Sequence, residues 1–138
     1  MRVILDTNVF VSGVFWKGTP AKILEAWIDG QFQIVVSMPI LEEYSRVLKD
    51  LGRKTPEVDV DRILALIGLH AEMVKPVRFA RPVCRDRDDD KFLEAAIGGG
   101  VSYVVSGDKD LLDTNGKIES CSVMKPSEFW AQLKTKSK

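Results

Sequence analysis

The sequence predicts an α/β fold: a three-layer α/β/α sandwich with a central, mostly parallel sheet. Short apolar runs that suit strands alternate with amphipathic helical patterns along the whole chain, and this alternation is typical of a parallel sheet covered on both faces. The length of 138 residues suits a single hydrophobic core. We therefore expect one domain over residues 1–133, followed by a basic C-terminal tail over residues 134–138.

The first half of the chain alternates strand patterns with helix patterns. Val3–Leu5 is short, apolar and β-branched at two positions, which predicts a buried strand. Residues 7–18 contain two glycines and predict a loop with room for a helical turn. Thr19 and Pro20 are a capping residue and a helix-starting proline, and Gly30 closes the helix. The next elements are a strand over 32–36, an amphipathic helix from 37 to about 51 and a helix over 60–72.

The second half continues the same alternation. Residues 73–77 suit a short edge strand, and Pro82 keeps residues 78–87 irregular. An aspartate at 88, 89 or 90 caps a helix that three glycines stop at 98–100. The remaining elements are a strand over 101–105, a turn at 106–108, a short helical segment over 109–112, a strand near 120–124 and a helix from 126 to about 134.

Composition and charge exclude several classes of protein. The 20 lysines and arginines balance the 20 aspartates and glutamates, which argues against a protein that coats nucleic acid by bulk charge. No apolar stretch suits a membrane span or a signal peptide, so we expect a cytoplasmic protein with no membrane contact. Cys84 and Cys121 lie far apart without metal-site spacing, which favours two reduced structural thiols over a disulfide or a zinc site.

Acidic residues follow the predicted strands at points that a parallel sheet brings together. Asp6 follows the first strand and Asp108 follows the strand over 101–105, and ligands of such sheets bind beyond the carboxyl ends of the strands. Glu43 near the start of the second helix and a capping aspartate of the fourth can reach the same rim. Carboxylates gathered in this way repel one another unless a cation is present. Hard Mg²⁺ or Mn²⁺ suits such oxygen ligands, and such ions can promote phosphodiester hydrolysis.

Four motifs in this order resemble the successive acidic motifs of the PIN-domain family. They are LDTNVFVSG at 5–13, ILEEYSRVL at 40–48, DRDDDKFLEAA at 86–96 and VVSGDKDLL at 104–112. The resemblance is closest to the VapC-like ribonucleases, the toxins of toxin–antitoxin systems. It implies a PIN-like α/β/α fold and an endoribonuclease that uses Mg²⁺ or Mn²⁺ on single-stranded or structured RNA. A homodimer and a cognate antitoxin protein are the partners that it leads us to expect.

The resemblance also implies roles for individual residues. The residues that match the metal-binding, catalytic acids are Asp6, Glu43, Asp90 and Asp108. Asp89 is an alternative to Asp90 as the ligand, because a helix cap can shift by one residue. For Asp110 two roles stay possible, a metal ligand or a helix cap that does not touch the metal. The positions expected to bind the cofactor are Thr7, Asn8 and Ser106. Of these, Thr7 and Asn8 match polar positions that are expected to orient Asp6 or a metal-bound water, and Ser106 stands where the motif usually has serine or threonine.

Other functions stay open at this point. A phosphatase of the haloacid dehalogenase type would need a second aspartate where Asn8 stands, which disfavours it. A non-catalytic RNA- or protein-binding module and a housekeeping RNA-processing nuclease are compatible with the same residues. Because the net charge is zero, RNA contact requires a local basic surface. The candidates for it are Lys49, Arg53, Lys54, Arg81, Arg85 and Arg87.

Overall fold

The centre of the structure, a computed structural model that describes residues 1–136, is a sheet of five strands in the order β3-β2-β1-β4-β5. All the paired strands run parallel. The strands are β1 (Arg2–Leu5), β2 (Gln33–Val36), β3 (Glu72–Met73), β4 (Tyr103–Val105) and β5 (Ser122–Met124). The predicted α/β fold with a central parallel sheet is confirmed.

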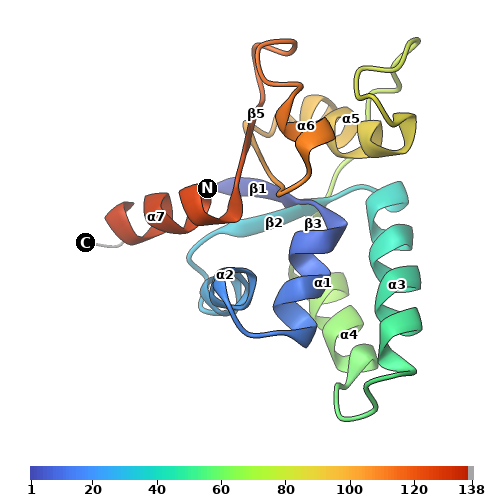
Figure 1. Cartoon of the computed structure of the whole chain (residues 1–138), viewed down its shortest axis with the longest axis vertical. Helices are drawn as coiled ribbons and strands as arrows, with labels where there is room; N and C mark the ends of the chain where they lie inside the picture. The colour runs from blue at the N-terminus through green and yellow to red at the C-terminus, as the bar shows by residue number, and fades with distance from the viewer. Residues whose placement is uncertain (137–138) are drawn as a thin grey trace.

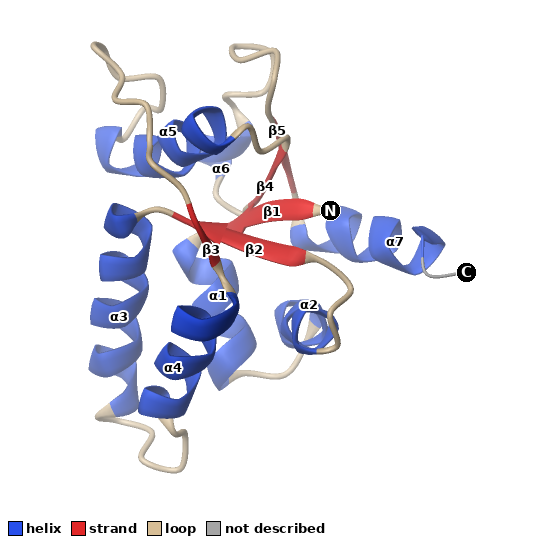
Figure 2. Cartoon of the chain, turned by 180° about the vertical axis from the view of Figure 1, so that it is seen from behind, coloured by secondary structure: helices blue, strands red, loops and turns tan. Residues whose placement is uncertain are grey.

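Helices cover both faces of this sheet. Helices α1 to α4 lie on one side and α5 and α6 on the other, while α7 packs against α2 (Figures 1 and 2). Within residues 1–136 the helices are α1 (Thr7–Phe15), α2 (Thr19–Ile28), α3 (Met38–Gly52), α4 (Val60–His70), α5 (Asp90–Gly99), α6 (Lys109–Leu112) and α7 (Pro126–Lys136). A single 3-10 turn, η1 (Arg87–Asp89), leads directly into α5. No helix in this part of the chain is long and apolar enough to cross a membrane.

Strand β1 lies at the point where the order of the strands reverses direction. The chain moves from β1 through β2 to β3 on one side and then returns to β4 and β5 on the other. Val3, Ile4 and Leu5 have no exposed surface, because helices cover both faces of the strand. In open α/β sheets the crevice beyond the carboxyl ends of such strands is where ligands bind. Asp6 and the segment after β4 both lie at this crevice.

The main departure from the sequence-based expectation lies in residues 7–18. Thr7–Phe15 form helix α1, and Phe10 within it is completely buried, so the predicted loop is wrong. The glycine that suggested a turn, Gly13, lies instead where α1 approaches α2. A Cβ atom on Gly13 would come within 2.7 Å of the Leu24 side chain, which explains a glycine in the middle of a helix.

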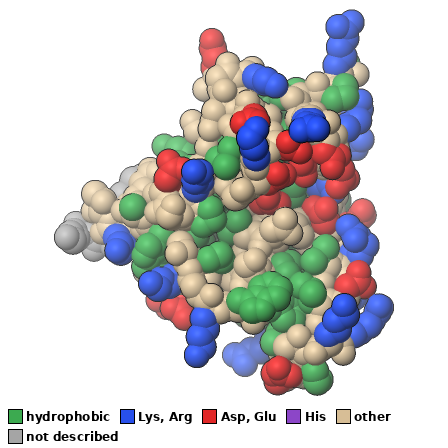
Figure 3. All heavy atoms as spheres, in the orientation of Figure 1, with side chains coloured by type: hydrophobic (Ala, Val, Ile, Leu, Met, Phe, Trp, Pro, Cys, Tyr) green, Lys and Arg blue, Asp and Glu red, His purple; other side chains and the backbone are tan. Residues whose placement is uncertain are grey.

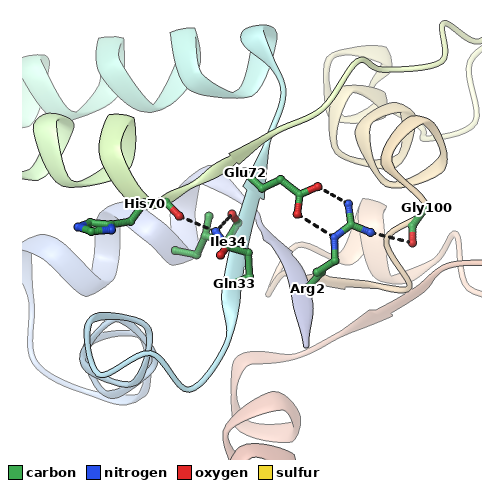
Figure 4. A network of polar contacts seen from close by, with 6 residues as sticks. All are labelled: Arg2, Gln33, Ile34, His70, Glu72 and Gly100. Atoms are coloured by element: carbon green, nitrogen blue, oxygen red, sulfur yellow. Dashed lines mark hydrogen bonds and ion pairs between the residues drawn. The ribbon is translucent and has the colours of Figure 1, made fainter.

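Polar contacts tie the amino ends of the strands together, opposite the crevice (Figure 4). Arg2 on β1 donates from Nε to Glu72 Oε1 on β3 at 2.9 Å and from Nη1 to the Gly100 carbonyl at 3.4 Å. Gln33 on β2 donates from Nε2 to the His70 carbonyl. His70, to which the sequence assigns no chemistry, therefore contributes a backbone acceptor here.

Candidate metal centre

Asp6 is fixed at the end of β1 by a short chain of hydrogen bonds to the segment after β4. Its backbone amide donates to the Val105 carbonyl at 2.9 Å, and the residue is 5% exposed. The fully buried Ser106 hydroxyl donates to Asp6 Oδ2 at 2.7 Å and accepts from the Asp108 amide at 2.9 Å. Ser106 therefore joins the two carboxylate-bearing strand ends.

Three aspartates beside Asp6 form a compact acidic cluster. Asp89, Asp108 and Asp110 each offer a carboxylate oxygen, and these oxygens all lie within 4.8 Å of one another. Asp108 also caps α6, because its Oδ1 accepts from the Asp110 amide at 3.1 Å. Acidic side chains gather on the face drawn in Figure 3, between α5, α6 and the start of α3. We call Asp89, Asp108 and Asp110 the aspartate cluster.

The acids at the crevice disfavour one another's ionised forms. Burial raises the pKa of Asp89 to about 7, and the hydrogen bond with Asp108 and the charges of Asp108 and Asp6 add to the rise. Burial also raises the pKa of Asp6, against the Ser106 hydrogen bond, and the charges of Asp108 and Glu43 act in the same direction as burial. A bound cation would relieve this repulsion.

Glu43 reaches the same rim from α3 but already has partners. The neighbouring Tyr44 is completely buried and donates its hydroxyl proton to the Leu5 carbonyl, which anchors α3 against β1. Thr7 Oγ1 donates to Glu43 Oε2 at 2.6 Å, and the Lys91 ammonium lies 3.3 Å from Glu43 Oε1. The charge of Glu43 therefore contributes to the raised pKa of Asp6, but Glu43 does not belong to the aspartate cluster.

Asp90 points into a loop rather than into the aspartate cluster. Asp90 is 3% exposed, and its two carboxylate oxygens accept from the backbone amides of Val83 at 3.0 Å and Cys84 at 2.7 Å. These bonds hold the irregular segment before η1 against α5. The structure thus brings Asp89, the alternative left open by the sequence, together with Asp108, and gives Asp90 a different set of partners.

Two clefts border the crevice. Exposed Asn8 lines one of about 390 Å³ together with Ser12 and Asp108. The other, of about 600 Å³, borders Glu43 and is lined by both acids and cations, the cations being Arg46, Arg78, Arg87 and Lys91. Of the basic residues suggested by the sequence, Arg87 lines this cleft, whereas Lys49 and Arg53 line a separate hollow of about 710 Å³. No sequence signal distinguished Arg46, Arg78 or Lys91 as residues of the crevice.

The donor set of the aspartate cluster suits a hard divalent cation. Its three carboxylate oxygens lie within 4.8 Å of one another, and oxygen atoms are the ligands that Mg²⁺ and Mn²⁺ prefer. Zinc favours thiolate and imidazole ligands, which the cluster does not contain. Cys84 and Cys121 are buried free thiols, and burial raises the pKa of Cys121 to about 11. The residues present therefore fit Mg²⁺ or Mn²⁺.

The burial of Asp89 and its repulsion by Asp108 and Asp6 predict that the free energy of unfolding of the metal-free protein falls as the pH rises. The pKa of the Asp89 carboxyl is 3.8 unperturbed and about 7 when folded, so between these values the folded state binds more protons than the unfolded state. The free energy of unfolding in EDTA should then fall from about pH 4 to about pH 7, and Asp89→Asn should flatten this fall. Urea unfolding at a series of pH values measures it. A stability that rises over this range, or a fall that Asp89→Asn leaves unchanged, would contradict the described electrostatics.

The chain matches a protein-family model and a known protein over most of its length. The family model described as PIN domain matches residues 2–110. An uncharacterized protein of Methanocaldococcus jannaschii is 31% identical over 119 residues, which cover 81% of this chain and 74% of that protein. The region that the family model matches contains Asp6, Glu43 and the aspartate cluster.

A solved structure shares the fold. The crystal structure of a protein from Pyrobaculum aerophilum matches with a TM-score of 0.62 over 97% of this chain and 89% of that chain. At 13% identity this likeness concerns the fold alone. The family model confirms the family expected from the four acidic motifs. The chain belongs to the PIN-domain family.

Proposed function

We propose that the protein is an endoribonuclease that hydrolyses phosphodiester bonds of single-stranded or structured RNA with Mg²⁺ or Mn²⁺. PIN domains are typically nucleases that use divalent metals. The observation that carries the proposal is the aspartate cluster beside Asp6, at the crevice where the strand order reverses. The raised pKa values of Asp6 and Asp89 support it, because both acids would gain from a cation.

The residues of the crevice have separate tasks in this proposal. Asp89 and Asp108 hold the metal, Asp6 and Asp110 complete its surroundings, and the bonds from Ser106 keep Asp6 in place. A divalent ion held there would supply the charge that lowers the pKa of a water and stabilises the phosphate as it reacts. Glu43, held by Thr7, orients the attacking water, and exposed Asn8 beside Asp108 contacts the substrate. Asp90 acts indirectly, by holding the loop at Val83 and Cys84.

The direct test is cleavage of end-labelled single-stranded RNA by the purified protein in Mn²⁺. EDTA should stop cleavage, and Asp6→Asn should slow it by at least about 100-fold, because a negative charge beside the metal is lost while the neutral side chain keeps an acceptor for Ser106. A simple phosphate monoester should not be hydrolysed. Cleavage that survives both EDTA and Asp6→Asn would rule out the proposed centre. RNA binding without any cleavage by the parent protein would favour the non-catalytic module.

The finer biological role rests on the resemblance of the four motifs. We propose a toxin with a cognate antitoxin partner, and a small antitoxin-like gene adjacent to its own would support this role. A different neighbourhood would favour housekeeping RNA processing. The proposed homodimer would have apolar surface to cover, because Trp16 is 58% exposed and Leu69 is 78% exposed.

A further inference from the structure

Lys91 is held between two carboxylates at the edge of the crevice. From the first turn of α5 its ammonium lies 3.3 Å from Glu43 Oε1 and 3.1 Å from Asp88 Oδ1. The side chains of Lys91 and Glu43 are each only 15% exposed, whereas Asp88 is 67% exposed. Lysine usually extends its charge into water, so an ammonium group this covered has a defined position.

This ammonium is one of the partners that hold the Glu43 carboxylate. One oxygen of Glu43 accepts from Thr7 at 2.6 Å and the other faces Lys91, with exposed Arg46 further away at 3.8 Å. Neither oxygen is left without a donor or a cation. Each oxygen of Glu43 therefore already has a partner, and a divalent ion bound to Glu43 would lie close to the Lys91 ammonium.

The acids on the other side of the crevice have no such cation. Among the described residues, the salt bridges involve neither Asp6 nor any member of the aspartate cluster. The crevice thus has an acidic half that lacks a positive charge, and a half around Glu43 that already contains one. A second divalent ion beside Glu43 would also be repelled by the ammonium group.

We infer that the Lys91 ammonium is a resident cation of the centre, so that the chain binds a single divalent ion on the aspartate cluster and none beside Glu43. The inference rests on the proposed metal-dependent function. It makes Lys91 a positioning residue, since it holds Glu43 in a fixed place next to the ion. Lys91 also lines the cleft of about 600 Å³, so its ammonium meets an RNA phosphate that enters there.

The test counts Mn²⁺ ions bound by the folded protein, with free Mn²⁺ measured by electron paramagnetic resonance. We expect one ion for the wild type, two for Lys91→Met and one for Lys91→Arg. The matched control is Lys109→Met, which removes the same charge from an 87% exposed lysine that pairs with Asp113, and it should bind one ion. Loss of the nearby ammonium should also tighten the first Mn²⁺ of Lys91→Met about 3- to 10-fold.

Cleavage gives a second signature. The cleavage rate of the wild type should follow a saturation curve for one bound Mn²⁺ ion. The cleavage rate of Lys91→Met should depend on two bound ions and should saturate only at a higher Mn²⁺ concentration. Two ions on the wild type, or a Lys91→Met variant that binds Mn²⁺ as the Lys109→Met control does, would overturn the inference and leave the nuclease proposal standing. A wild type that binds no Mn²⁺ would overturn both. If Lys91→Met fails to fold, the wild-type count and Lys91→Gln decide in the same way.

Discussion

Replacing Asp108 by asparagine should remove Mn²⁺ binding and lower RNA cleavage by about 100- to 1000-fold, the effect of several kcal/mol of lost charge stabilisation. Asp108 belongs to the aspartate cluster, and it also caps α6 by accepting from the Asp110 amide. Asparagine keeps an oxygen for this cap, and the backbone bond from residue 108 to Ser106 does not depend on the side chain. The fold should therefore survive while the ligand charge is lost. Calorimetric Mn²⁺ titration and the RNA assay measure the two effects.

The matched control for this change is Asp113→Asn. Asp113 directly follows α6, is 59% exposed and pairs with Lys109 at 3.2 Å, so the same charge is removed a short distance along the chain. This control should keep Mn²⁺ binding and cleavage close to wild type. Equal losses in the two variants would indicate a general effect of charge and would remove Asp108 from the proposed centre.

Replacing Asp90 by alanine should destabilise the protein by about 2–5 kcal/mol, because two backbone amides lose their charged acceptor. The amides belong to Val83 and Cys84, and Cys84 is only 3% exposed, so water replaces the lost bonds poorly. Asparagine at the same position keeps one strong acceptor and should have about half the effect. Urea unfolding in EDTA measures the change. Folded Asp90→Asn should still bind Mn²⁺.

Asp89→Asn should show the opposite pattern. Asp89 belongs to the aspartate cluster, and its pKa of about 7 reflects burial and repulsion, so its neutralisation removes repulsion rather than a needed bond. We expect Mn²⁺ binding to be lost while stability in EDTA stays the same or rises. Loss of Mn²⁺ binding in Asp90→Asn together with normal binding in Asp89→Asn would return the ligand role to Asp90.

The sequence was sufficient for the fold and for the rim of the crevice. Buried runs such as Val3–Leu5 could be read as strands because parallel strands are apolar on both faces. The positions of Asp6 and Asp108 then followed, since residues directly after parallel strands share one edge of the sheet. The hydrogen bond from the Ser106 hydroxyl to Asp6 Oδ2 became visible only in the structure.

Orientation within short segments could not be derived in the same way. Asp89 and Asp90 are adjacent, and the 3-10 turn that ends at Asp89 decides which carboxylate turns to the crevice and which to the loop. The pairing of Lys91 with Glu43 depends on how α5 packs beside α3, which no local pattern encodes. The loop predicted around Gly13 was wrong for a related reason. Close helix packing and turns both favour glycine, and the sequence does not distinguish the two.

The central claim is that Asp89 and Asp108 hold one divalent ion at the end of β1 and β4. A crystal structure with Mn²⁺, with the ion located by its anomalous scattering, tests it most directly. We expect a single peak at about 2.1 Å from carboxylate oxygens of Asp89 and Asp108, with the Lys91 ammonium still beside Glu43. An ion bound to Asp90, a second ion on Glu43, or no ion in the crevice would contradict the claim.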